Sequence, residues 1–182
     1  SYPGAGGDCG ATLAVGASCD VVLSFSPSVN APLADTFDLQ YFDGALNQNL
    51  TKDVQGTGGA PAILDIAGLD PHNFGTQALT SNNVVTLTMN NSGAVPATSI
   101  TDTLTLSAPM GFVGGTYPGG VGTCGATLNA SATCTLQVEY IPSAAVVTNQ
   151  TITLAYDDGT GATVLNHGLT GTGANPANLS IT

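Results

Sequence analysis

Positive charge is almost absent from this chain of 182 residues, because Lys52 is its one cationic side chain against twelve Asp and Glu, for a formal net charge of −11. Nucleic-acid binding depends on clusters of Lys and Arg that neutralise phosphates. Anionic lipid surfaces attract the same kind of cluster. The composition therefore excludes nucleic acid as a partner and disfavours attraction to a membrane surface.

Tryptophan is absent as well, and Phe and Tyr together make up 5% of the chain. A platform that stacks on sugar rings is correspondingly disfavoured. No run of about 18 apolar residues is present, so we expect no membrane insertion in this segment. Residues 1–20 lack a basic stretch followed by an apolar core, which excludes a signal peptide there.

The signatures of catalysis are missing too. No nucleophile elbow, HExxH or phosphate-binding glycine loop occurs, so we expect no enzyme, no catalytic or cofactor-binding residue and no dedicated metal site. His72 and His167 occupy unrelated positions and are interpreted as solvated turn or strand residues.

Short strands and tight turns are predicted from what the chain does contain, including 24 Gly and 10 Pro. Apolar and polar residues alternate with a period of two in a series of short segments. No segment keeps a helical period, so we expect almost no helix. The predicted strands are Asp20–Phe25, Asp35–Phe42, Leu50–Gln55, Ala62–Ile66, Val84–Met89, Ala97–Leu106, Cys134–Tyr140, Gln150–Tyr156 and Val164–Thr170. We place Asn73–Gly75 in a connection and Ser107–Gly115 in a loop.

An internal repeat organises these segments. The opening residues SYPGAGGDCGATL return as TYPGGVGTCGATL at 116–128, which places Cys124 115 positions after Cys9. A fixed offset is the mark of a tandem array. We therefore predict three parts: the C-terminal part of a first repeat (1–59), a complete repeat (60–174) and the first strand of a following repeat (175–182). The chain is interpreted as a segment of something longer.

The predicted fold is all-β: tandem immunoglobulin-like antiparallel β-sandwiches with a 115-residue repeat. The complete repeat resembles the bacterial choice-of-anchor D repeats, relatives of the abnormal-spindle/hydin-type (ASH) immunoglobulin-like domains. The resemblance is carried by Asn73-Phe74-Gly75, Thr86–Ser92, Cys124–Cys134, Val138–Ser143 and Leu169–Gly173. It implies stalks, adhesins or structural fibres of large secreted or surface-attached bacterial proteins, with no catalytic residue set.

The cysteines form two C-x₉-C pairs, Cys9 with Cys19 and Cys124 with Cys134. The spacing is too wide for the paired ligands of a zinc site, and a redox-active pair would show C-x-x-C beside a basic group. We predict one structural disulfide in each repeat rather than a bond between repeats, because each cysteine has a local partner. Disulfides indicate an extracellular or periplasmic location.

Two weaker candidates remain open. The carboxylates Asp157-Asp158 and Asp65/Asp70 could bind calcium, although their spacing matches no defined calcium loop. Possible glycosylation sites are the N-x-[ST] sequons, several of which would arise by chance in a chain this rich in Asn, Ser and Thr. They are Asn49, Asn90, Asn129, Asn149 and Asn178.

The leading hypothesis is an extracellular structural or adhesive module of a stalk or fibre, whose partners are neighbouring repeats or identical subunits. Because residues 1–59 lack the first half of a repeat, an alternative is a filament in which copies complement each other by strand addition. In that variant the segment Asn178–Thr182 would be the donated strand. A carbohydrate- or protein-binding module is the other alternative, its ligand unknown.

Overall fold

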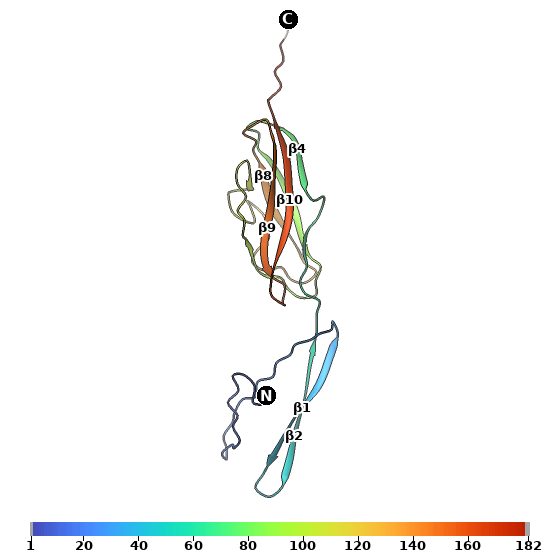
Figure 1. The fold of residues 1–182 in the computed structure, drawn as a ribbon, viewed down its shortest axis with the longest axis vertical. Helices are drawn as coiled ribbons and strands as arrows, with labels where there is room; N and C mark the ends of the chain where they lie inside the picture. The colour runs from blue at the N-terminus through green and yellow to red at the C-terminus, as the bar shows by residue number, and fades with distance from the viewer. Residues whose placement is uncertain (1, 181–182) are drawn as a thin grey trace. The chain divides into compact units, whose positions relative to one another are not determined.

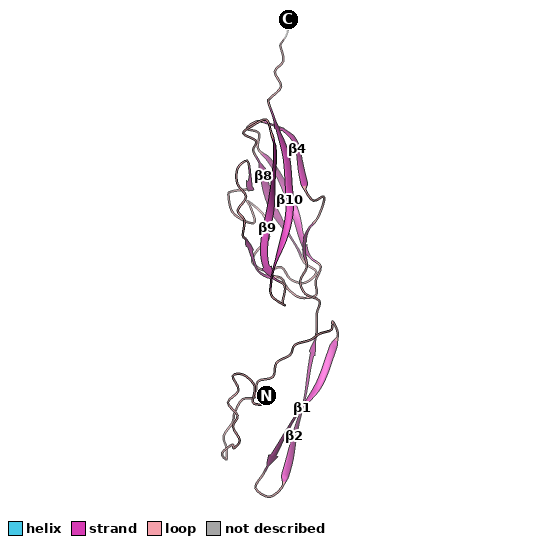
Figure 2. Cartoon of the chain, in the orientation of Figure 1, coloured by secondary structure: helices cyan, strands magenta, loops and turns pink. Residues whose placement is uncertain are grey.

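The computed structural model describes residues 2–180, and every regular element in them is a β-strand (Figure 2). The all-β expectation is confirmed, and no helix in that part of the chain is long and apolar enough to cross a membrane. The chain divides into two compact units, Ser1–Gly59 (unit 1) and Ala60–Thr182 (unit 2).

Unit 1 contains one antiparallel hairpin, formed by β1 (Pro32–Phe42) and β2 (Asn47–Thr57). Asp43 builds its turn, since its Oδ1 accepts hydrogen bonds from the backbone N–H groups of Ala45 and Leu46, each at 2.8 Å. These bonds, above all the one from Leu46, lower the pKa of the Asp43 carboxyl. A short polar side chain that caps its own backbone is typical of turns.

Unit 2 is a sandwich of two four-stranded sheets. The first has the order β3-β5-β8-β7, with bounds Leu64–Ile66, Asn83–Asn91, Thr133–Tyr140 and Met110–Phe112. The second has the order β4-β10-β9-β6, with bounds His72–Ala78, Ala162–Ala174, Val147–Asp157 and Thr98–Asp102. Figure 1 shows the second sheet's long strands β9 and β10 side by side.

This order is the ABED and CFG arrangement of immunoglobulin-like domains, with the first strand divided between the sheets as β3 and β4. One pairing departs from the antiparallel expectation, because β4 runs parallel to β10, with Leu169 opposite His72. The chain crosses from one sheet to the other between Ile66 and His72. After this crossing, β4 lies beside β10 and runs in the same direction as β10.

The core lies between the sheets and follows from the period of two. Along β8 every second residue is buried, ending at Val138 and Tyr140, which are both fully covered. Ile152 and Leu154 of β9 face them with no exposed surface. Burying an aliphatic side chain of this size contributes about 1.5–3 kcal/mol. The alternation that predicts these strands therefore also supplies most of the core.

One buried polar side chain, Asn91 at the end of β5, holds three connections together. Its Nδ2 donates to the carbonyl oxygens of Val95 and Leu128 at 2.9 and 3.1 Å, and its Oδ1 accepts from Ile63 and Gly93 at 3.2 and 3.0 Å. With its donors and acceptors used, Asn91 can remain 1% exposed without the usual cost of burying an amide.

Four local predictions are wrong. Asn73–Gly75 lies in β4 rather than in a connection, and β7 (Met110–Phe112) lies inside the predicted loop. Asp20–Phe25 forms no strand, because β5 and β7, which pair with the matching strand β8 in unit 2, have no counterpart in residues 1–59. The predicted strand at 175–182 is not formed in residues 175–180, and residues 181–182 lie outside the described residues.

Candidate functional site

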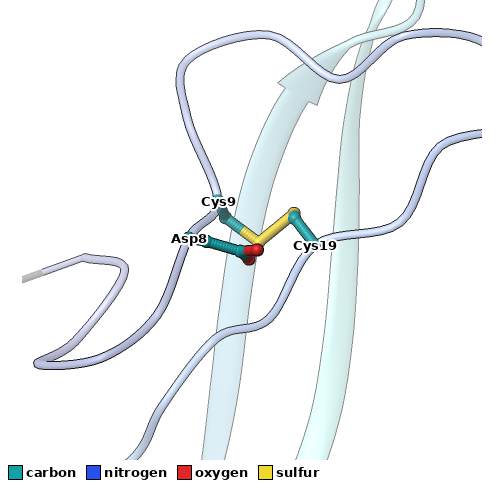
Figure 3. Close-up of side chains that lie close together, drawn as sticks. All are labelled: Asp8, Cys9 and Cys19. Carbon is teal, nitrogen blue, oxygen red and sulfur yellow. A yellow bond between two sulfur atoms is a disulfide. The ribbon is translucent and has the colours of Figure 1, made fainter.

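Each unit contains one disulfide-closed loop. Cys9 bonds to Cys19 (Figure 3) and Cys124 to Cys134. The Cα–Cα distance is 4.9 Å in both. Closing a loop of about ten residues contributes about 2–3 kcal/mol by restricting the unfolded chain. The two predicted pairings are present, and Cys9 and Cys124 are buried.

The first loop places the Asp8 carboxylate beside the two sulfur atoms, as Figure 3 shows. Metals bind cysteine as the thiolate, and both sulfurs are used in the disulfide. Asp8 instead serves the loop, because its Oδ1 accepts a hydrogen bond from the backbone N–H of Asp20 at 2.6 Å. Thr123 has the same role in unit 2, where its Oγ1 accepts from Thr135 at 3.0 Å. In both units this side chain holds the backbone of the loop together.

Tyr117 closes the second loop against the sandwich. Its hydroxyl donates to the Gly125 carbonyl at 3.2 Å, and its ring meets Phe112 edge to face at 5.8 Å between centroids. Burial raises the pKa of the Tyr117 hydroxyl to about 12. The matching residue of unit 1, Tyr2, is 49% exposed. The loops are alike, but only the second one packs against a core.

A groove of about 560 Å³ lies in unit 1. Leu23 and Phe25 form one wall, and Phe37 of β1 and Val54 of β2 form the other. A Cβ at Gly56 would lie 2.8 Å from the Phe25 ring, so this glycine lets the ring lie on the hairpin. The groove is therefore lined by apolar and polar side chains together.

The same positions form the closed core of unit 2. Leu23 and Phe25 are 53% and 54% exposed, whereas Val138 and Tyr140, 115 positions later, are 0% exposed. Gly171 makes room for the Tyr140 ring as Gly56 does for Phe25, with a would-be Cβ 2.7 Å away. The groove is thus lined by residues whose counterparts in unit 2 face the interior of the sandwich.

The predicted calcium ligands do not gather into a group of three within residues 2–180. Asp158 accepts hydrogen bonds from Thr160 and Gly161, and these, led by the one from the Thr160 hydroxyl, lower the pKa of its carboxyl. Asp157 caps Gly159 at 2.8 Å. Asp70 accepts from the backbone N–H of Gly168 at 2.7 Å. These carboxylates serve turns and strand ends.

The histidines come together across the parallel pair β4–β10, which their positions in the sequence do not indicate. The expectation that His167 is solvated is wrong, because the strand β10 places it inside the fold at 3% exposure. Its Nε2 has no hydrogen-bond partner among the described residues. Burial, and next the charge of His167, lower the pKa of His72, whose ring also packs edge to face on Phe74 at 5.1 Å.

Of the sequon asparagines, four have exposed side chains and Asn90 is half-buried. The exposed four are Asn49 on β2, Asn149 on β9, and Asn129 and Asn178 outside the strands. Glycan attachment at these positions stays a prediction.

No family model and no curated protein matches the chain. Among solved structures, the VesB protease of Vibrio cholerae is similar at 15% identity over 62% of this chain, with a TM-score of 0.46, and the match spans 32% of VesB. The ASH/PapD-like domain 7 of human CEP192 is similar at 12% identity over 63% of this chain and 87% of that one, with a TM-score of 0.42. A protein of unknown function from Porphyromonas gingivalis W83 is 9% identical over 85% of this chain and 70% of its own, with a TM-score of 0.45.

These likenesses concern the fold alone. Unit 2 is an immunoglobulin-like β-sandwich by its own strand order. Similarity to part of a protease at this level transfers no activity.

Proposed function

We propose that the chain is part of an extracellular array of immunoglobulin-like repeats, of the choice-of-anchor D kind, that serves as a stalk or fibre of a bacterial surface or secreted protein. The observation that carries the proposal is the register of the two hairpins. In unit 1 Pro32 pairs with Thr57 and Phe42 with Asn47. In unit 2 each pair lies 115 positions later along the whole ladder, beginning with Val147 opposite Thr172.

The disulfide loops support the same proposal. Two disulfides persist in oxidising surroundings, which favours a location outside the cytoplasm. Beyond the shared spacing, the loops share backbone hydrogen bonds, such as Asp8 to Asp20 at 3.1 Å and Thr123 to Thr135 at 2.9 Å. Repetition of a rigid unit suits a mechanical role. We assign no catalytic residue.

Antibodies raised against the purified chain provide the test on intact cells of the source organism. Labelling before permeabilisation, on thin fibres seen by electron tomography, is the expected result. Labelling that appears only after permeabilisation would contradict an extracellular array. An antibody against a cytoplasmic enzyme serves as the control for cell integrity.

A second candidate is a filament whose repeats complement one another by strand addition. A groove lined by Leu23, Phe25 and Phe37 leaves apolar surface in water that a neighbouring polypeptide could cover. The remaining alternative is a carbohydrate- or protein-binding module. A glycan array probed with the full chain tests for a carbohydrate ligand directly.

A further inference from the structure

The histidine of β10, His167, is buried without a partner for one of its ring nitrogens. It is 3% exposed, and no group of the described residues forms a hydrogen bond with its Nε2. Buried polar atoms are nearly always paired, because an unpaired one loses its bonds to water and gains none in return. The imidazole nitrogen is also the commonest metal ligand in proteins. The position therefore suits a bound ion.

The second histidine, His72 of β4, lies on the neighbouring strand (Figure 1). The two strands run parallel with Leu169 opposite His72, so His167 stands two residues from the position that faces His72. Neighbouring strands are about 4.8 Å apart and two residues span about 6.6 Å, which puts the two Cβ atoms about 8 Å from each other. Two imidazole rings can cross that gap to one ion, with metal–nitrogen distances of about 2.0–2.1 Å.

Both rings lie on the inner face of the sheet. Every second residue in the middle of β10 is buried, and His167 is one of them. On β4 the half-buried His72 packs edge to face on Phe74 at 5.1 Å between centroids, and Phe74 packs on the core residue Tyr140 at 5.4 Å. After burial, the charge of His167 is the cause that lowers the pKa of His72, as expected for neighbouring rings.

The start of β4 is fixed against β10 next to this pair. The Oδ1 atom of Asp70 accepts a hydrogen bond from the backbone N–H of Gly168 at 2.7 Å. A Cβ at Gly168 would lie 2.9 Å from that oxygen and 3.0 Å from the Pro71 Cβ, so the glycine allows the close approach. His167 precedes Gly168 and His72 follows Pro71 in the chain. The two histidines are thus held near each other before any ion binds.

The available donors define the kind of ion. On the β9 side of His167 its paired residue, Ile152, is apolar and 0% exposed, so the ion would lie on the β4 side. Within residues 2–180 the two histidines do not belong to a group of three His, Cys, Asp or Glu ligand atoms within 4.8 Å of one another. Water would complete the coordination. Imidazole ligands suit Zn²⁺ and Cu²⁺, whereas Ca²⁺ and Mg²⁺ prefer oxygen.

We propose that His72 and His167 bind one divalent transition-metal ion of the Zn²⁺ or Cu²⁺ class, with Nε2 of His167 and one ring nitrogen of His72 as the protein ligands. The ion joins the edge strand β4 to β10 and gives the Nε2 of His167 its partner. The sequence did not predict this site, since it indicated no dedicated metal site. The proposal is independent of the proposed function, because it depends on unit 2 alone.

The full chain is first freed of metal with a chelator, and urea unfolding of unit 2 is then followed by circular dichroism with and without Zn²⁺. Saturating Zn²⁺ should raise the folded-to-unfolded ratio at least about tenfold, because the ion binds the folded state. His72→Gln and His167→Gln should each remove this effect. Asp65→Asn, which changes an exposed carboxylate of β3, is the matched control and should keep it. Calcium in place of zinc should give no comparable rise.

The half-buried position of His72 keeps the test decisive if His167→Gln fails to fold. Cu²⁺ gives a second readout, because its electron paramagnetic resonance spectrum should show two imidazole nitrogens in the chain and one in His72→Gln. An unchanged urea midpoint in Zn²⁺ would overturn the proposal. Equal stabilisation of the chain and of His72→Gln would overturn it as well, in favour of binding by surface carboxylates. Neither result bears on the cell-surface labelling, which tests the array separately.

Discussion

The hairpin β1–β2 in unit 1 and the hairpin β9–β10 in unit 2 have the same register but different surroundings. In the second hairpin the inner face carries Ile152 and Leu154, both 0% exposed. In the first, Phe37 and Leu39 at the same positions are only half-buried. The difference teaches that turn chemistry and pairing are local, whereas burial is given by strands far away in the sequence.

The largest expected difference comes from deleting a matched core side chain. Leu154→Ala should lower the free energy of unfolding of unit 2 by about 2–5 kcal/mol, because it leaves a cavity between two sheets. Leu39→Ala at the same position of unit 1 should change the free energy of unfolding measured for the chain by less than about 0.5 kcal/mol. Urea unfolding followed by circular dichroism measures both. Equal losses would mean that the face of β1 is covered in solution.

Removing the disulfides should give the next largest difference in stability between the two units. The double change Cys124→Ala and Cys134→Ala should lower the stability of unit 2 by about 2–3 kcal/mol, as expected for opening a short loop. Cys9→Ala with Cys19→Ala should leave the same unfolding transition in place, because that loop is not attached to a closed core. Hydrogen exchange of the two loops shows where order is lost. A shift of the main transition by the second pair would contradict this separation.

Acid should destabilise unit 2 by a smaller amount, through His72. Its pKa is lowered in the folded state, by burial and then by His167. The unfolded chain thus takes up the proton first, so the contribution of His72 is intact above about pH 6.5 and is lost as the pH falls through that value. Unfolding measured from pH 8 to 5 should show the loss, and His72→Gln should reduce its slope. An unchanged slope in that variant would contradict this source.

The smallest effect is expected at Tyr140, where unit 1 has Phe25. The Tyr140 hydroxyl is buried and has no hydrogen-bond partner in the described part of the chain. Tyr140→Phe should therefore be neutral or stabilise unit 2 by less than about 1 kcal/mol, since an unpaired buried hydroxyl is unfavourable. Urea unfolding provides the measurement, with Tyr156→Phe as the control, because the Tyr156 hydroxyl accepts from Leu64 at 3.4 Å. A loss above 1 kcal/mol at Tyr140 would reveal a partner.

Most strands of unit 2 could be predicted because their alternation reports burial on one face, as at β5 and β8. The strand β4 could not, because its sequence HNFGTQA mixes polar residues with a glycine and gains its place by pairing in parallel with β10. Asp20–Phe25 failed for the opposite reason. Its pattern suits a strand, but a strand also needs a partner.

The candidate site divides in the same way. The cysteine pairing was predictable from spacing, since each cysteine has a partner ten positions away. The groove was predictable only in outline, as a half sandwich with open edges. The sequence did not predict that His72 and His167 lie on paired strands, because β4 and β10 are nearly a hundred positions apart in the chain.

By itself the sequence determined the strands' alternation, the disulfide loops and the shared register of the two hairpins, all of which depend on neighbouring residues and short turns. Tertiary structure alone decided which copy of that pattern became a core. The reason is physical: an apolar face is buried only when another sheet lies on it. Unit 2 supplies that sheet from β3, β5, β8 and β7.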